Sequence, residues 1–187
     1  VIQGSTVLVI GLGDIGTSFA AKMKALGCRT IGVKRRVGDK PEAVDELYGM
    51  EELDNLLPRA DVVAMSLPGN PSTYHVLNRE RIALLSSSAI VLNAGRGTAI
   101  DTDALSDALY EGKIAGAALD VTDPEPLPAE HPIWKAPGAI ITPHISGGYA
   151  LPETLQQIAE IFADNLRRYQ AGEPLKNVID LETGYCK

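Results

Sequence analysis

Short apolar runs alternate along this chain with segments whose apolar residues recur at helical spacing. The apolar runs predict buried strands of a parallel sheet, because strands covered on both faces need no polar alternation. They lie at residues 7–10, 29–33, 61–67, 88–93, 114–119 and 139–142, with a shorter candidate at 47–48. The helical patterns cover residues 15–26, 50–57, 103–111 and 152–169. Alternating strands and helices predict an α/β fold of three layers (αβα), in which a doubly wound, parallel sheet is the middle layer.

A glycine motif directly follows the first predicted strand. Gly11, Gly13 and Gly16 form the pattern G-x-G-x-x-G between a strand and a helix, which is the context in which this pattern binds a dinucleotide. Gly11 permits a tight turn, Gly13 lets the backbone approach a pyrophosphate, and Gly16 lets helix and strand pack closely. The phosphates would lie at the helix N-terminus, whose free N–H groups favour an anion. The motif predicts a Rossmann-type dinucleotide-binding domain; a glycine turn that binds nothing is the alternative.

The residues that end the second predicted strand bear on the choice of dinucleotide. In NAD-preferring domains an Asp or Glu about 20 residues past the glycines binds the ribose 2′-hydroxyl. Lys34, Arg35 and Arg36 stand there instead, and three cations suit a 2′-phosphate. NADP is therefore the favoured cofactor and NAD a possible one. A solvated basic turn at the end of a strand is the alternative.

Length, charge and cysteines narrow the class of protein. The 187 residues suit one domain, and their net charge of −7 argues against nucleic acid as a partner. No membrane span or signal peptide is visible, so no membrane partner is expected. Cys28 and Cys186 lack metal or redox spacing, so we expect no metal site and a reducing cytoplasm. A start at Val1 rather than Met indicates a piece of a longer protein or a processed chain.

The loop after the strand at 61–67 is expected to contact the cofactor. In a doubly wound sheet the loops at the carboxyl ends of strands line the ligand crevice. Pro68 and Thr73 lie in this loop, so we expect them to form part of the cofactor wall. His75 follows them, and we expect it to be structural, because a lone histidine in such a loop is more often a loop or packing residue than a catalyst.

Four charged or titratable residues follow the later strands at their carboxyl ends. They are Arg96, Asp120, Glu125 and His144. An arginine can clamp the carboxylate of a 2-oxo acid with its planar fork, and a histidine can pass a proton to the carbonyl oxygen. A neighbouring glutamate would orient the imidazole and stabilise its cationic form. The set predicts a reaction on a carbonyl or alcohol that bears a carboxylate; the alternative is ordinary loop charges.

The sequence resembles the D-isomer-specific 2-hydroxyacid dehydrogenases over nearly its whole length. The motifs that carry the resemblance are the glycine fingerprint at 11–16 and the segments 93–97, 118–126, 142–144 and 172–178. The resemblance implies an oxidoreductase that transfers a hydride between NAD(P) and a D-2-hydroxy acid or 2-oxo acid. It also implies a homodimer.

The resemblance further implies a role for each matching position. Arg96 would orient the substrate, His144 would donate and accept the proton, and Glu125 would partner that histidine. Contact with the cofactor is implied for Asp14, Ile15, Pro68, Thr73, Ala94, Gly95, Arg96, Asp120 and residues 144 to 147, with Gly147 at the end. Lys34 departs from the pattern, because NAD-dependent relatives carry Asp there, and this supports NADP.

A larger departure concerns the substrate domain, which the family builds mostly from sequence ahead of the nucleotide-binding domain. Nothing of that kind precedes Val1, so residues 1–187 are expected to be the NAD(P)-binding domain without the substrate domain. Alone, such a chain would bind cofactor and turn over feebly. The rival hypotheses are a non-catalytic dinucleotide sensor like the C-terminal-binding corepressors, and a structural module that binds no dinucleotide. Turnover of an oxo acid by the full-length protein would separate the enzyme from the sensor.

Overall fold

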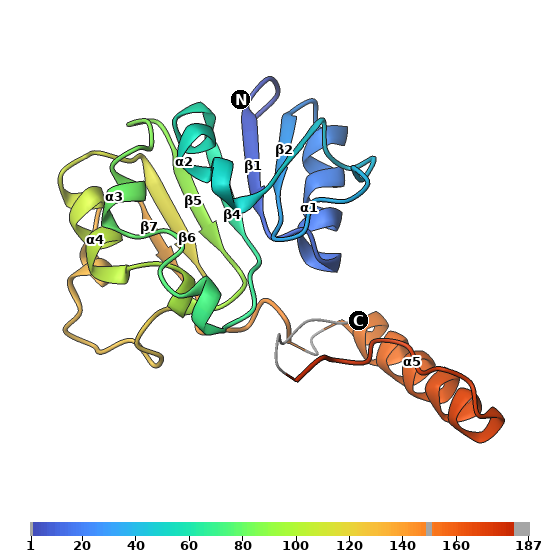
Figure 1. Cartoon of the computed structure of the whole chain (residues 1–187). Coiled ribbons are helices and arrows are strands. Elements are labelled where there is room, and N and C mark those ends of the chain that lie inside the picture. The colour runs from blue at the N-terminus through green and yellow to red at the C-terminus, as the bar shows by residue number, and fades with distance from the viewer. Residues whose placement is uncertain (1, 149–150, 182–187) are drawn as a thin grey trace. The chain divides into compact units, whose positions relative to one another are not determined.

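One parallel sheet forms the centre of the first part of the chain. The computed structural model describes residues 2–148 and 151–181, and its contacts divide the chain into two compact units, Val1–Pro143 and His144–Lys187. Within the described residues, seven strands pair in parallel in the order β3-β2-β1-β4-β5-β6-β7 (Figure 1). The strands are β1 (Thr6–Ile10), β2 (Arg29–Val33), β3 (Glu46–Tyr48), β4 (Val62–Met65), β5 (Ile90–Asn93), β6 (Gly116–Leu119) and β7 (Ala139–Ile141). The strand order reverses between β3 and β4, so the predicted doubly wound sheet is confirmed.

Helices cover both faces of this sheet, as the three-layer prediction requires. They are α1 (Asp14–Ala25) on one face, and α2 (Leu53–Leu56), α3 (Arg79–Ile82) and α4 (Thr102–Tyr110) on the other (Figure 1). Val7 and Val9 pack with Ala20 of α1, whereas Leu8 and Ile10 belong to the core on the opposite face. Successive side chains of a strand point to opposite faces. A strand covered on both faces is therefore apolar at every position.

Short 3₁₀ helices join these elements. They are η1 (Met50–Glu52), η2 (Leu57–Arg59), η3 (Pro71–Thr73), η4 (Gly97–Ala99) and η5 (Pro132–Lys135). The helix predicted at 50–57 is therefore α-helical only in α2, because Pro58 in η2 has no backbone N–H to continue the ladder. The sequence pattern does not predict η3 and α3. Asn70 and Asn78 cap them, accepting hydrogen bonds from backbone N–H groups at 3.0 Å each.

The N-terminus of α4 is capped by Asp101, the residue that precedes the helix. Asp101 Oδ1 accepts a hydrogen bond from the Ala104 N–H at 2.9 Å, whereas Thr102 is the first helical residue. The Thr102 hydroxyl instead accepts a bond from the Asp123 N–H at 3.3 Å. Gly112 follows the helix with a φ of 64°, a left-handed conformation that ends helices at little cost for glycine.

The second unit contains one long helix, α5 (Pro152–Ala171). It ends at Gly172, which has a φ of 68° and the left-handed conformation usual at this position. The apolar residues that recur at helical spacing along α5 are exposed, namely Leu155, Ile158, Phe162, Leu166 and Tyr169. The sequence pattern treats residues 1–187 as one domain and does not separate this unit from the first.

The segment after α5 returns along the helix and is held there by polar contacts. The Lys176 N–H donates to Asn165 Oδ1 at 2.8 Å, and Lys176 Nζ lies 2.8 Å from Asp164. Arg168 contacts the same carboxylate at 3.0 Å. The bond from Lys176, followed by the bond from Arg168, lowers the pKa of Asp164 to about 2.

Three further findings bear on the expectations from composition. Cys28 is a buried free cysteine in the core beneath α1, and Cys186 lies outside the described residues. No helix in the described parts of the chain is both long and apolar enough to cross a membrane. Residues 2–148 and 151–181 contain no group of three His, Cys, Asp or Glu side chains that could hold a metal ion.

Candidate functional site

The glycine turn lies at the carboxyl end of β1, in the centre of the sheet. Gly11 has a φ of 96°, and its N–H donates to Val33 O at 2.9 Å. A Cβ on Gly16 would lie 1.9 Å from Gly11 O, so the start of α1 and the turn pack with no room for a side chain. A Cβ on Gly13 would meet nothing within 4 Å. The glycine at position 16 therefore serves packing, and the one at position 13 leaves open space.

That open space lies over the N-terminus of α1. Gly13 is the N-cap residue, and no side chain in the described part of the chain caps the helix. The first N–H groups of α1 are therefore available to an anion, and the helix dipole favours a negative charge there. Asp14 and Ile15 form the first residues of the helix, and both are exposed. The residues present fit the pyrophosphate of a dinucleotide.

The basic turn lies at the end of β2, the strand beside β1. Lys34 is half-buried and its N–H donates to Tyr48 O at 3.1 Å, while Arg35 and Arg36 are exposed. The bond from Gly11 to Val33 ties the glycine turn to this strand end. The three cations thus follow the strand that the glycine turn contacts.

The loop after β4 is held by bonds of its own. Ser66 Oγ donates to Gly11 O at 2.9 Å, which joins this loop to the glycine turn. Thr73 is buried, and its hydroxyl lies 2.7 Å from Pro68 O and 2.9 Å from Asn70 O. The polar group of Thr73 is therefore used inside its own turn, and the turn places Pro68 at the carboxyl edge of the sheet.

The side chain of His75 makes a local contact. Its ring stacks on Tyr74, with ring centroids 3.9 Å apart and an interplanar angle of 12°. The His75 N–H donates to Thr98 O at 2.8 Å. This backbone bond joins the loop after β4 to η4, and the structural role expected of the His75 side chain stays a prediction.

The loop after β5 is packed tightly between its neighbours. A Cβ on Gly95 would lie 2.6 Å from Leu67 N, and one on Gly97 would lie 1.8 Å from Thr122 O. Arg96, between these two glycines, is exposed, and its Nη1 donates to Gly95 O at 2.8 Å. The two glycines therefore pack directly against the backbone of Leu67 and Thr122, and the side chain of Arg96 between them extends to the surface.

A mostly apolar cavity of about 260 Å³ lies at the carboxyl edge of the sheet, against α1. Ile15, Ala94 and Asp120 belong to its lining. Asp120 is buried at the end of β6, and Thr142 Oγ1 donates to its Oδ1 at 2.5 Å. Asn93 also lines this cavity, although the sequence patterns do not single it out. The signal for Asn93 was a polar residue at the end of an apolar strand.

A second cavity, of about 790 Å³, brings two of the predicted catalytic residues together. Arg96 and Glu125 both line it, with Asn70 and Tyr74 on the side of the loop after β4. Glu125 is exposed in the proline-rich loop. The sequence places these two residues far apart, and the folding of loops over one edge of the sheet gives them a shared cavity.

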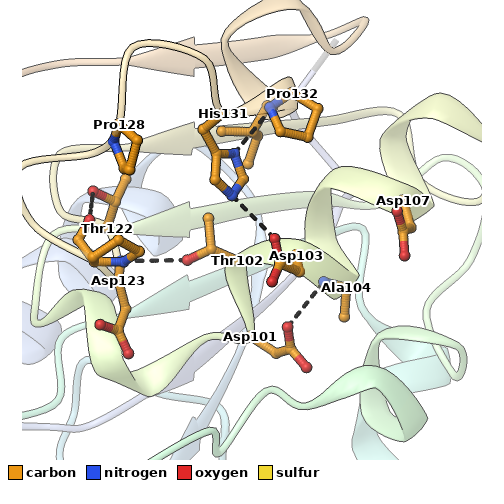
Figure 2. Close-up of polar contacts among 12 residues, drawn as sticks. Asp101, Thr102, Asp103, Ala104, Asp107, Thr122, Asp123, Pro128, His131 and Pro132 are labelled. Atoms are coloured by element: carbon orange, nitrogen blue, oxygen red, sulfur yellow. Dashed lines mark hydrogen bonds and ion pairs between the residues drawn. The ribbon is translucent and has the colours of Figure 1, made fainter.

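The loop that carries Glu125 is anchored to α4 and η5 by polar contacts, which Figure 2 shows. The Asp123 N–H donates to Thr102, and Thr122 Oγ1 donates to Pro124 O at 3.0 Å. His131 Nε2 lies 3.1 Å from Asp103 Oδ1, while its Nδ1 accepts the N–H of residue 133 at 3.2 Å. Both ends of the loop are therefore fixed.

The remaining predicted site residues belong to the second unit. His144 and Gly147 follow β7 in the chain and lie after Pro143, the last residue of the first unit. His144 is exposed and has a φ of 53°. The first unit thus contains Arg96 and Glu125 in one cavity, and the predicted proton carrier belongs to the next unit.

Comparison with known proteins identifies similar chains. Residues 1–146 match the family model described as D-isomer specific 2-hydroxyacid dehydrogenase, NAD binding domain. The glyoxylate reductase of Thermofilum pendens is 37% identical over 174 residues, covering 92% of this chain and 50% of that protein. The D-3-phosphoglycerate dehydrogenase of Methanocaldococcus jannaschii is 38% identical over 183 residues, covering 96% and 34%. The chain thus spans half or less of the length of these two relatives.

Solved structures show the same similarity. A D-isomer specific 2-hydroxyacid dehydrogenase from Xanthobacter autotrophicus, in complex with NADPH and MES, has a TM-score of 0.87 and 37% identity, covering 97% of this chain and 73% of that one. An NADPH-dependent glyoxylate/hydroxypyruvate reductase from Sinorhizobium meliloti, in complex with NADP and sulfate, has a TM-score of 0.85 and 32% identity. The matched region covers 97% of this chain and 57% of that one.

Proposed function

Because this chain belongs to the D-isomer specific 2-hydroxyacid dehydrogenases and matches their NAD-binding domain, we propose that it serves an oxidoreductase of D-2-hydroxy acids. In this proposal it binds a dinucleotide at the carboxyl edge of the sheet and presents Arg96 and Glu125 to a 2-oxo acid. The observation that carries the proposal is their shared cavity, which lies at the edge where the glycine turn leaves α1 uncapped. Ligands of doubly wound sheets bind at this edge.

The strand order gives the proposed orientation of the cofactor. The pyrophosphate would lie over Gly13, at the N-terminus of α1. Because β2 lies on one side of β1 and β4 on the other, the adenosine half would extend toward Lys34. The nicotinamide half would extend toward Ala94 and Asp120. When bound, the nicotinamide supplies or accepts a hydride.

We propose that NADP is preferred over NAD. Lys34, Arg35 and Arg36 follow β2, where a carboxylate would bind the free ribose hydroxyl of NAD. The guanidinium groups can bind a 2′-phosphate through paired hydrogen bonds. The similar structures from Xanthobacter autotrophicus and Sinorhizobium meliloti contain NADPH and NADP respectively, which supports the same choice.

The proposed chemistry divides among three side chains. Arg96 would hold the carboxylate of the 2-oxo acid and orient its carbonyl carbon toward the nicotinamide. As the hydride reaches that carbon, His144 would give a proton to the carbonyl oxygen, which leaves a 2-hydroxy acid and the oxidised cofactor. Glu125 would stabilise the protonated imidazole and keep its orientation.

The wider setting of the domain is part of the proposal. Residues 1–187 would act as the NAD(P)-binding domain of an enzyme, and a separate substrate domain would select the side chain of the acid. We also propose a homodimer that acts in the cytoplasm on a small 2-hydroxy or 2-oxo acid, without nucleic acid or membrane partners. The isolated chain would bind cofactor and have weak turnover at most.

The test is a calorimetric titration of the chain with NADPH and with NADH. We expect tighter binding of NADPH, and we expect the preference to fall when Arg35 and Arg36 are replaced by alanine. Lys40→Ala serves as a control, because it removes a cation of the same segment whose Nζ is bonded to Val44 O at 2.8 Å. Equal or tighter binding of NADH would remove the NADP preference. Binding of neither dinucleotide would overturn the proposed function.

A further inference from the structure

Asn93 is the last residue of β5, and within the described residues its side chain is bonded to the loop that follows. It is buried, with 2% of its surface exposed. Its Oδ1 accepts the Gly95 N–H at 3.0 Å, and its Nδ2 donates to Arg96 O at 3.0 Å. One amide group therefore holds two successive residues of the loop by their backbone. We infer that Asn93 is a positioning residue for the nicotinamide end of the site, an inference that rests on the proposed function.

The bonds continue from Asn93 to the guanidinium of Arg96. Asn93 fixes the N–H of Gly95, and the carbonyl of the same Gly95 accepts a bond from Arg96 Nη1 at 2.8 Å. The orientation of the Arg96 guanidinium therefore depends on the orientation of Gly95, whose N–H is bonded to Asn93. Removing the Asn93 amide would free both the backbone and the head of Arg96.

The backbone of Asn93 joins this loop to the neighbouring strand end. Its carbonyl accepts the Asp120 N–H at 3.0 Å, and Asp120 lines the same apolar cavity as Asn93 and Ala94. A single residue therefore connects the loop with Arg96 to the buried carboxylate at the end of β6. Both lie on the side of the sheet to which we assign the nicotinamide half.

The loop after β5 is packed so closely that it has little space in which to shift when the Asn93 bonds are lost. Gly95 has no room for a Cβ against Leu67, and Gly97 has none against Thr122. A loop packed this closely against Leu67 and Thr122 cannot shift slightly and keep these contacts, because protein interiors are close-packed. We therefore expect the loss of the Asn93 bonds to move the loop outward rather than to be absorbed.

A merely structural role makes a different prediction. Any buried amide needs hydrogen-bond partners, and removing one destabilises the whole fold without regard to the cofactor. Thr30 is a matched comparison: it is fully buried on β2, near the amino end of the strand, and its hydroxyl contacts Ala43 O at 3.1 Å and the Asp45 N–H at 3.2 Å. Replacing Thr30 by valine removes contacts of the same kind away from the proposed site.

The experiment compares two ligands on the same chain. NADPH contains both halves of the dinucleotide, whereas 2′-phospho-ADP-ribose lacks the nicotinamide ring. Each is titrated calorimetrically into the wild type, Asn93→Asp, Asn93→Ser and Thr30→Val, under conditions where circular dichroism shows each protein to be folded. Asn93→Asp keeps the acceptor for Gly95 and loses the donor for Arg96; Asn93→Ser provides a second, uncharged variant.

We expect both Asn93 variants to lose about tenfold in affinity for NADPH, because binding must then also order the loop that Asn93 no longer holds in full. Their affinity for 2′-phospho-ADP-ribose should stay within about twofold of the wild type, since the adenosine half lies by β2. Thr30→Val should leave the ratio of the two affinities unchanged.

Two results would overturn the inference in distinguishable ways. If the wild type binds both ligands and the Asn93 variants keep the wild-type ratio of affinities, Asn93 has no positioning role and the proposed function stands. If the wild type binds neither ligand, the proposed function fails and the positioning role fails with it.

Discussion

Replacing Gly16 by alanine tests whether close packing of α1 against the glycine turn is required for folding. The added Cβ would lie 1.9 Å from Gly11 O and must move by about 1.5 Å to reach the 3.4 Å at which ordinary contact begins. The obstacle is a backbone atom, which cannot rotate away as a side chain can. Overpacking of this kind costs up to about 3 kcal/mol.

A favourable term partly offsets that cost. Gly16 lies inside α1, where alanine is favoured over glycine by about 1 kcal/mol. The expected net loss is therefore about 2 kcal/mol in the free energy of unfolding. For a slope of about 2 kcal/mol per molar urea, this lowers the urea midpoint by about 1 M.

Gly13→Ala is the matched control for this prediction. The Cβ added there meets nothing within 4 Å, and the backbone has an extended φ of −80° that alanine adopts readily. Gly13 is the N-cap of α1, where alanine is less favourable than glycine, so the stability of Gly13→Ala should stay within about 1 kcal/mol of the wild type. Its affinity for NADPH should nevertheless fall, because the methyl group occupies the space proposed for the pyrophosphate.

Urea unfolding followed by circular dichroism, together with NADPH titration, measures both effects. The packing argument is refuted if Gly16→Ala unfolds at the wild-type urea concentration. It is also refuted if Gly13→Ala loses as much stability as Gly16→Ala, because the two sites would then not differ in the space around them.

Two further predictions concern a helix cap and an acidic group. Asp101→Ala should lower the free energy of unfolding by about 1 kcal/mol because it removes the cap of α4, whereas Asp101→Asn keeps an acceptor and should change it little; urea unfolding of both variants measures this. The pKa of Asp164 is about 2 in the folded chain, below its ordinary value of 3.8, so its contribution to stability is complete above about pH 4 and is lost as the pH falls through 2. The helical signal of the chain should therefore weaken over that range, and less so in Asp164→Asn; equal pH profiles would contradict this.

Comparing the predicted apolar runs with the observed ends of the strands shows that an apolar pattern predicts burial rather than strand pairing. The run at 29–33 coincides with β2, whereas the run at 61–67 is longer than β4, which ends at Met65. Leu67 is buried although it lies outside the strand. Hydrophobicity predicts burial, and a residue that is buried in a loop is indistinguishable by this criterion from one that pairs in a sheet.

Thr73 shows a limit of a different kind. Its position after β4 predicts a place on the cofactor wall, but its hydroxyl is bonded within its own turn. The position of a residue at the edge of a sheet follows from strand order, and the direction of its polar group follows from the local turn. A capping interaction of Asn70 with the backbone of Ser72 determines that turn, and no periodicity reveals it.

Arg96 and Asn93 together explain which part of a site can be predicted from sequence. Parallel strands bring all their carboxyl ends to one edge, so a charged residue after such a strand, like Arg96 or Glu125, is expected near the ligand. Asn93 acts through backbone groups two and three residues ahead. Its sequence signals are a polar residue at the end of an apolar strand and the tendency of asparagine to bond to a following turn, and neither shows which groups it holds. Groups that reach the ligand are therefore predicted from topology, whereas groups that hold them in place are found only from the hydrogen bonds of the folded loop.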